Sequence, residues 1–208
     1  MMIEDFGARV ASVWEGMRST TRSLIVGALQ SSNAGTGAAS TTRNGSPYDA
    51  RADWELSRLL AALDERATEA GASLNDEQAR ELRRMAETCA VVLQHQTQSA
   101  EVFAQLVERA FGLRDYARID ALADALAARF APSEVCELAR YPHVVVRALA
   151  QESLAQSPTT MLIGLLADPV DSDVARDALE RQAEEYGSEQ ARQIVKLLDQ
   201  ADMAEDEA

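Results

Sequence analysis

The chain of 208 residues carries a net charge of −14, from 34 acidic and 20 basic residues. Such an excess of acid repels the phosphates of nucleic acids and the head groups of anionic membranes, so we expect neither a nucleic acid nor a membrane as the main partner. Apolar residues make up 47% of the chain and aromatic residues only 5%, a composition that suits closely packed helices better than a β-sandwich. No stretch of the sequence approaches the roughly 20 apolar residues of a membrane span.

Residues 1–30 are predicted to form an N-terminal amphipathic helix, or two helices with a break near Ser19. Apolar residues recur at steps of three and four from Phe6 to Ala28. The acidic residue Glu4 stands where a secretory signal would be basic. The segment either docks on another molecule, with weak contact to a membrane surface as a further alternative, or folds back on the helices that follow.

Residues 31–48 are mostly small and polar, and Arg43 is their only charged residue. Such a stretch cannot bury enough apolar surface to offset its ordering entropy, so we expect a flexible linker that tethers the N-terminal helix. Residues 49–200 are predicted to form a helical-repeat domain, and residues 201–208 an acidic, frayed tail.

The apolar pattern predicts four helices between residues 49 and 130, and no strand. Gly71 and Gly112 are expected to end the first and third of these helices, and Ser73 to cap the second. Cys89 and Cys136 fall on apolar faces, without metal-ligand spacing to a histidine, and are predicted to be reduced core thiols. The apolar faces are expected to include Leu56, Leu59, Leu60, Leu63, Ala67, Leu82, Met85, Leu93, Phe103, Leu106, Phe111, Leu122 and Leu126.

One helical hairpin occurs twice between residues 132 and 186. Apolar residues and a proline of its first helix recur after 27 residues, and apolar residues of its second helix recur after 28. A weaker copy begins at Ala117, and three units at this period predict a helical solenoid. The matching pairs are Val135 with Leu162, Leu138 with Leu165, Pro142 with Pro169, Val146 with Val174, and Ala150 with Ala178.

The ends of these helices can also be predicted. Pro142 and Pro169 each separate a first helix from a second, because proline cannot continue a helix interior. Asp171 is expected to cap the helix that follows Pro169. Gly187 is expected to end that helix, and Ser188 to cap the next one.

The pattern Leu165-Leu166-x-Asp168-Pro169, and the pattern Val146-Arg147-x-x-Ala150-x-x-x-Leu154, resemble the short HEAT-like repeats of bacterial proteins. Leucine-rich-variant repeats and bilin-lyase-type HEAT repeats share these features. The resemblance covers about residues 115–200. It departs at Arg176, which stands one position after the family's arginine, and at Gln182, which replaces a leucine. It implies an all-α, HEAT-like solenoid of stacked helical hairpins.

Three arginines, Arg118, Arg147 and Arg176, follow one another at intervals of 29 residues. Residues one period apart line up on successive helices of a solenoid, so we expect a column of guanidinium groups. The column, together with Gln151, either binds carboxylates of a partner or pairs with acids of neighbouring repeats. The expected pairing acids are Asp120, Glu152, Asp173 and Asp177.

The sequence predicts no catalytic residues, no cofactor and no metal. Scattered acids such as Asp124 and Glu134 are expected to be solvated, and no serine has a histidine at plausible triad spacing. The expected function is that of a non-catalytic protein–protein interaction module, an adaptor or regulatory scaffold in the cytoplasm. The alternative, implied by the resemblance, is a bilin-lyase-like HEAT-repeat enzyme or chromophore chaperone. It would need a polar pocket of tetrapyrrole size and a usable acid.

Overall fold

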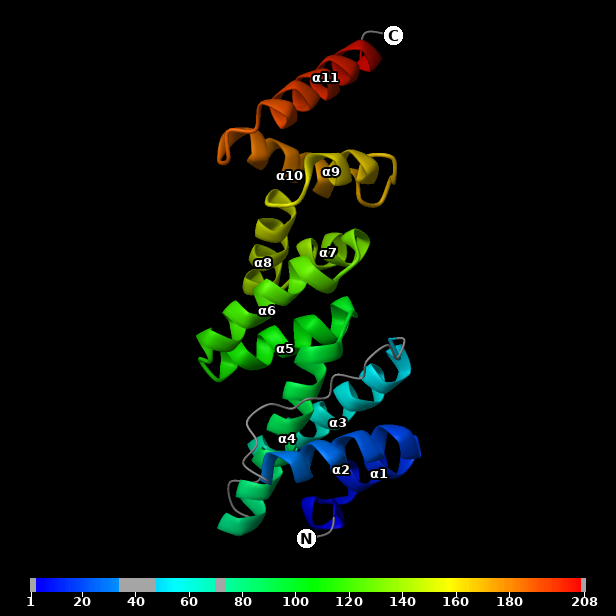
Figure 1. The fold of residues 1–208 in the computed structure, drawn as a ribbon, viewed down its shortest axis with the longest axis vertical. Helices are drawn as coiled ribbons and strands as arrows, with labels where there is room; N and C mark the ends of the chain where they lie inside the picture. Colours follow the sequence, from blue (N-terminus) through cyan, green and yellow to red (C-terminus); the bar gives the residue numbers. More distant parts are fainter. Residues whose placement is uncertain (1–2, 34–47, 70–73, 207–208) are drawn as a thin grey trace. The chain divides into compact units, whose positions relative to one another are not determined.

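The computed structural model describes residues 3–33, 48–69 and 74–206 (Figure 1). These residues form eleven α-helices and one 3-10 helix, with no strand among them, so the all-α prediction is confirmed. The chain divides into two compact units, Met1–Val102 and Phe103–Ala208, which are described separately below as unit 1 and unit 2.

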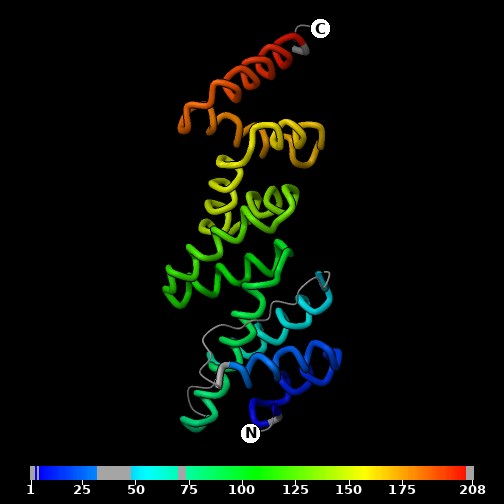
Figure 2. The backbone as a smooth tube through the Cα atoms, in the orientation of Figure 1, coloured from blue at the N-terminus to red at the C-terminus, as the bar shows by residue number. Residues whose placement is uncertain are grey.

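Unit 1 is built around two long helices, α3 and α4, that pack against each other. The shorter α1 packs against α3, and α2 contacts both α3 and α4, as the tube in Figure 2 also shows. Six leucines of α3 and α4 are almost completely buried: Leu56, Leu59, Leu60, Leu63, Leu82 and Leu93. The elements are η1 (Ile3–Phe6), α1 (Ala8–Gly16), α2 (Ser19–Asn33), α3 (Ala50–Glu69), α4 (Asp76–Gln96) and α5 (Ala100–Gly112), of which α5 crosses the boundary between the units.

The N-terminal segment folds back on the helices that follow it. Phe6, Val10 and Ile25 are almost completely buried, and they belong to the same unit as α3 and α4. The chain therefore divides at Val102 and not at residue 49, because the apolar faces of α1 and α2 are covered by α3 and α4. The expected break near Ser19 is present, between α1 and α2.

The expected linker begins later than predicted. Residues 31–33 still belong to α2, and residues 34–47 lie outside the described residues. The prediction that Ser73 caps α4 is wrong. The cap is Asn75, whose Oδ1 accepts from the backbone N–H of Gln78 at 2.9 Å, while the Gln78 side chain accepts from the N–H of Asn75 at 3.1 Å.

Unit 2 contains the two predicted helical hairpins. In the first, α7 packs against α8, and in the second, α9 packs against α10. Helix α8 also contacts α6 on one side and α10 on the other, and α11 packs against α10. The bounds are α6 (Tyr116–Arg129), α7 (Pro132–Ala139), α8 (Val144–Ala155), α9 (Thr159–Leu165), α10 (Ser172–Glu184) and α11 (Glu189–Asp206).

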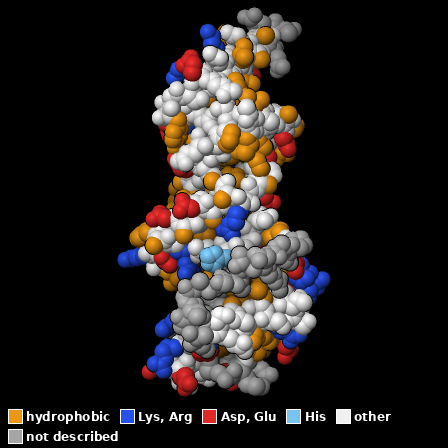
Figure 3. All heavy atoms as spheres, viewed as in Figure 1, with side chains coloured by type: hydrophobic (Ala, Val, Ile, Leu, Met, Phe, Trp, Pro, Cys, Tyr) orange, Lys and Arg blue, Asp and Glu red, His pale blue; other side chains and the backbone are white. Residues whose placement is uncertain are grey.

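The helical repeat residues are mostly buried where the period predicts. Leu138, Val146 and Leu162 are completely buried, whereas Leu165 and Val174 are half-buried. Pro142 lies in the turn between α7 and α8, and the equivalent proline lies between α9 and α10, as expected. Figure 3 shows hydrophobic side chains at the surface over α9, and the exposed hydrophobic residues of α9 and the turn after it include Ile163 and Val170.

Gln182, which replaces the leucine of the repeat pattern, is buried and hydrogen-bonded at both ends of its amide. Its Oε1 accepts from the hydroxyl of Thr159 at 2.9 Å, and its Nε2 donates to the carbonyl oxygen of Ser157 at 2.5 Å. Thr159 is the first residue of α9 and Ser157 lies two residues before it, so this one side chain connects α10 to the beginning of its partner helix.

The predicted helix ends of unit 2 are confirmed at Gly187 and Ser188 and differ in part at Asp171 and in the acidic tail. Gly187 has a φ of +67°, which ends α10, and the Ser188 hydroxyl accepts from the N–H of Ala191 at 3.2 Å, as expected. Asp171 occupies the N-cap position of α10, as predicted, but its side chain makes no capping hydrogen bond. The acidic tail expected at 201–208 is helical as far as Asp206, the end of α11; residues 207–208 lie outside the described part of the chain.

Most of the predicted apolar faces are buried, including both cysteines. Ala67 and Phe111 are exceptions, because both are exposed. The Phe111 ring contacts the ring of His143 edge to face, with centroids 5.4 Å apart. Phe103, which is buried, makes a similar contact with Phe130 at 5.2 Å.

Replacing Gly187 by alanine tests the left-handed end of α10. An L-residue at this positive φ costs about 1 kcal/mol, so Gly187→Ala is expected to destabilise unit 2 by that amount in chemical denaturation. Gly164→Ala is the matched control. Gly164 lies in α9 with open space around an added Cβ, so alanine there is expected to stabilise by up to about 1 kcal/mol. Equal effects at both glycines would contradict the assignment.

Candidate functional site

A groove of about 650 Å³ lies in unit 2 between α8 and α10, with the last residues of α7 at its edge. Its floor is apolar and is formed by Ala139, Leu154 and Ala178, which are buried. Ala148 and Val174 contribute the walls, one from each helix. The volume falls within the range of about 300–1,000 Å³ that is common for binding pockets.

The groove arises from helical spacing on its two sides. Lining residues recur on α10 at three- or four-residue steps from Val174 to Glu185, and on α8 from Ala148 to Glu152. Each helix therefore presents one continuous face to the groove. The alanines at positions 148 and 178 are small, so the two helices leave space between these faces.

The rim of the groove is acidic. Five carboxylates and two guanidinium groups line it, and the arginines are Arg140 and Arg181. Arg181 bridges two of the acids, with its Nη2 3.2 Å from Glu152 and 3.0 Å from Glu185. These ion pairs raise the pKa of Arg181, and the contact with Glu185 has the largest effect. The lining acids are Glu152, Asp177, Glu180, Glu184 and Glu185.

Glu152 is the most heavily engaged of these acids. Its carboxylate accepts hydrogen bonds from the hydroxyl of Tyr186 and from Nε2 of Gln156, the latter at 2.6 Å. These hydrogen bonds lower the pKa of Glu152, and the bond from Tyr186 has the largest effect. Partial burial acts in the opposite direction. The hydrogen bond to Glu152 in turn raises the pKa of Tyr186. Glu152 is therefore a carboxylate at neutral pH.

Asp177 and Glu184 are the two acids that remain available. Both are exposed, and neither makes a hydrogen bond or an ion pair with another of the residues that the structure describes. They lie on the groove face of α10 seven residues apart, which corresponds to about 10 Å along the helix axis. Two unpaired carboxylates thus stand in a row beside the apolar floor.

Arg140, the other lining arginine, is held by the turn before α10. Its Nη2 lies 2.9 Å from Oδ1 of Asp171, which is buried, and its Nη1 donates to the carbonyl oxygen of Val170 at 3.1 Å. The buried thiol of Cys136 lies in the same region. Burial, followed by the negative charge of Asp171, raises the pKa of this thiol to about 11, so it is protonated at neutral pH.

The three arginines of the expected column each contact groups of unit 2. Arg118 lies 3.4 Å from Asp115, three residues earlier on the chain. Arg147 donates to the backbone carbonyl of Tyr141 at 3.1 Å and to that of Pro142 at 3.4 Å.

Arg176 is bound by three carboxylates. Its Nε lies 3.3 Å from Glu180 on the same helix, and its two terminal nitrogens contact Asp199 and Asp202 of α11. These contacts raise the pKa of Arg176, and the contact with Asp202 has the largest effect. Asp202 was expected to belong to the frayed tail of residues 201–208.

Of the four residues expected to bind a partner, Gln151 lines the groove. The residues missed in the sequence include Arg140, Arg181 and Glu184. A signal for part of this set was present, because Glu152 and Arg181 are also 29 residues apart and carry opposite charges. One repeat period therefore places an acid of α8 beside a base of α10.

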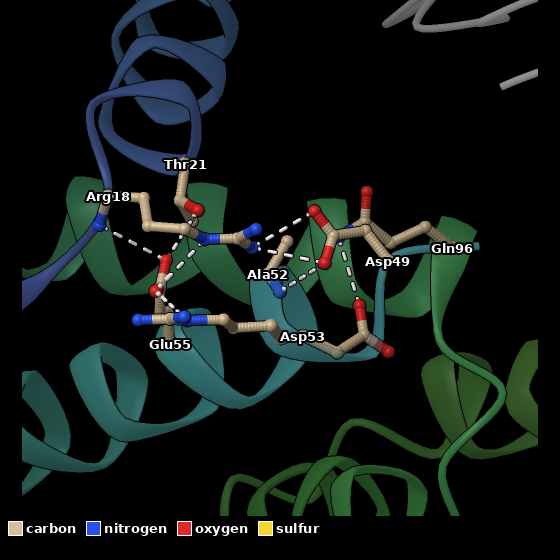
Figure 4. Close-up of polar contacts among 8 residues, drawn as sticks. Arg18, Thr21, Asp49, Ala52, Asp53, Glu55 and Gln96 are labelled. Carbon is tan, nitrogen blue, oxygen red and sulfur yellow. Dashed lines mark hydrogen bonds and ion pairs between the residues drawn. The ribbon is translucent and has the colours of Figure 1, made fainter. Parts of the chain in front are cut away.

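Unit 1 contains a second group of polar residues, which forms a network around the buried carboxylates of Asp53 and Glu55 (Figure 4). Glu55 of α3 is only 3% exposed. Its carboxylate accepts from the Thr21 hydroxyl at 2.5 Å, from Nε of Arg18 at 3.1 Å and from the Arg18 backbone N–H at 3.3 Å. Arg18 also pairs with Asp49 at 2.9 Å. Burial raises the pKa of Glu55, but these hydrogen bonds outweigh it and leave the pKa below its ordinary value.

Asp53, two residues before Glu55, is 1% exposed and connects α3 to the end of α4. Its carboxylate accepts from the hydroxyl of Tyr48 at 2.9 Å and from Nε2 of Gln96 at 3.0 Å. Burial is the main cause that raises the pKa of Asp53. Burial and the hydrogen bond to Asp53 raise the pKa of Tyr48 to about 12. Because every one of these groups is bound by its neighbours, the network has a structural role and holds the N-terminal segment on α3.

The sequence matches no model of a known protein family, and searches of curated proteins and of solved structures found no similar chain. Within residues 3–33, 48–69 and 74–206, no group of three or more His, Cys, Asp or Glu side chains could hold a metal ion. No helix in the same ranges is long and apolar enough to cross a membrane. The bilin-lyase-like alternative stays a prediction, which an absorbance titration with a bilin would test.

Glu55→Gln is expected to destabilise unit 1 by about 1.5–3 kcal/mol at pH 7, because a charged acceptor with several donors is lost. The pKa of Glu55 is lower in the folded protein than in the unfolded chain. Its contribution to the free energy of unfolding is therefore complete above the ordinary glutamate pKa and disappears as the pH falls through the pKa of the folded protein. The stability difference measured by denaturation should therefore shrink on acidification. Glu15→Gln, at an exposed position of α1, should have little effect at either pH.

Arg176→Gln is expected to loosen α11, because it removes the ion pairs with Asp199 and Asp202. Backbone amides of α11 should exchange hydrogen for deuterium faster, as followed by mass spectrometry. Lys196→Gln removes one positive charge from an exposed position of α11 itself and should leave the exchange unchanged. Identical exchange in wild type and Arg176→Gln would show that apolar packing alone holds α11.

Proposed function

We propose that this protein is a non-catalytic protein–protein interaction module, an adaptor or regulatory scaffold, whose unit 2 is a HEAT-like solenoid. The repeat period of 27–29 residues supports the solenoid, as do the contacts of α8 with both α6 and α10. In this arrangement the second helices of successive repeats lie next to each other, and their exposed faces make a continuous surface.

The observation that carries the proposal is the groove between α8 and α10. Its lining comes from two successive repeats and combines an apolar floor with a charged rim. This distribution resembles the apolar core and polar rim of protein–protein interfaces. Glu152 is ionised and Cys136 is protonated at neutral pH, so neither is prepared for acid or nucleophilic catalysis.

The proposed contact surface differs from the arginine column expected from the sequence. Arg176 already neutralises carboxylates of α10 and α11, and Arg147 is bound to backbone carbonyls. Gln151 and the groove around it are instead the proposed binding region. A protein partner and a location in the cytoplasm remain predictions of this proposal.

Blocking the groove with a bulky side chain tests the proposal. Ala148 is exposed and lines the groove, so Ala148→Trp should fill it without disturbing the core. Proteins captured from a lysate of the source cells by the immobilised intact chain are quantified by mass spectrometry. At least one protein should be captured at least about tenfold less by Ala148→Trp, a loss of roughly 1.4 kcal/mol in binding.

Ala127→Trp is the matched control, since Ala127 is exposed on α6 and belongs to the same unit. It should capture the same proteins as the wild type. If no captured protein depends on position 148 more than on position 127, the groove is not the interaction surface and the proposed function is wrong.

A further inference from the structure

The groove has a surplus of negative charge that its own arginines do not neutralise. Arg140 is paired with Asp171, and Arg181 with Glu152 and Glu185. The carboxylates of Asp177 and Glu184 remain without an ion pair to the residues that the structure describes. A ligand that enters the groove therefore meets two unneutralised acids, and these favour a cation.

The positions of these two acids restrict the shape of the ligand. They are seven residues apart on one face of α10, about 10 Å along the axis, and both line the groove. A helix lying along α10 presents side chains at the same spacing when they are seven residues apart in its own sequence. Two lysines or arginines at such positions can each reach one carboxylate.

The apolar floor requires a ligand with an apolar face between its cations. Leu154 and Ala178 are buried at the base of the groove, and Val174 lines it beside them. These are small or medium side chains in a shallow depression, which suits the apolar face of a helix. A wholly polar cationic chain would leave the accessible apolar side chains of Ala148 and Val174 uncovered.

On these grounds, and resting on the proposed function, we propose that the groove binds a basic amphipathic helix of the partner protein. Two cationic side chains of that helix, seven residues apart in its sequence, pair with Asp177 and with Glu184. Acidic segments are disfavoured, because both lining arginines are already paired with carboxylates of this chain.

The probe is a fluorescein-labelled peptide of about 20 residues, designed to be helical, with lysines at positions i and i+7 beside a leucine and alanine face. Its binding to the full chain is measured by fluorescence anisotropy at low and at physiological salt. We expect saturable binding that weakens with salt, and no binding of the same peptide with glutamates in place of the two lysines.

The double variant Asp177→Asn/Glu184→Gln should raise the Kd of the lysine peptide about tenfold, because it removes two ion pairs that lie partly within the groove. The control Asp120→Asn/Asp124→Asn makes the same change of charge at exposed positions of α6 and should change the Kd less than about twofold. Circular dichroism confirms that both variants fold, which is expected because all four positions are exposed.

The two proposals can fail independently. If cellular proteins depend on Ala148 but the lysine peptide does not bind, or binds equally to both double variants, the basic-helix inference is overturned and the interaction function stands. If the peptide binds through Asp177 and Glu184 but no cellular protein depends on Ala148, the inference about the groove's chemistry stands and the interaction function is overturned.

Discussion

Unit 2 depends on the sharing of apolar surface between neighbouring helical hairpins. Its helices α7 and α9 have eight and seven residues, which is fewer than the roughly 12–15 that an isolated helix needs to be even marginally stable in water. Each is stabilised because residues such as Leu138 and Leu162 are completely buried against neighbouring helices. The groove exists for the same reason, since α8 and α10 are held at a fixed separation by the hairpins to which they belong.

Arginines that each bind more than one carboxylate neutralise part of the excess negative charge. Arg18 joins Asp49 to Glu55 in unit 1, and in unit 2 Arg176 and Arg181 each contact at least two acids. Such shared arginines bring like charges together at positions where repulsion would otherwise push helices apart. They also leave few positive charges for outside partners, which is why the groove between α8 and α10 keeps a negative rim.

Local features of the sequence predict the hairpins well, and they fail where distant segments meet. The leucine spacing, Pro142 and the pair Gly187 and Ser188 act within a few residues, so their structural consequences could be deduced directly. The partners of Arg176 could not, because Asp199 and Asp202 lie on the next helix and their position depends on how α11 turns back. For the same reason the burial of the N-terminal helices was only one of two alternatives. Asp171 occupies the predicted N-cap position, but its side chain binds an arginine 31 residues earlier, which the sequence did not predict.

Gln182 has a consequence for the alignment of α9 with α10. A leucine at this position could be buried equally well after α10 had slipped by one turn, since apolar contact has no preferred direction. The amide of Gln182 bonds simultaneously to the Thr159 hydroxyl and the Ser157 carbonyl, and a slip would break both hydrogen bonds and leave the buried amide unsatisfied. This glutamine therefore fixes the register of the hairpin, and it exchanges some apolar burial for a single way of assembling two helices.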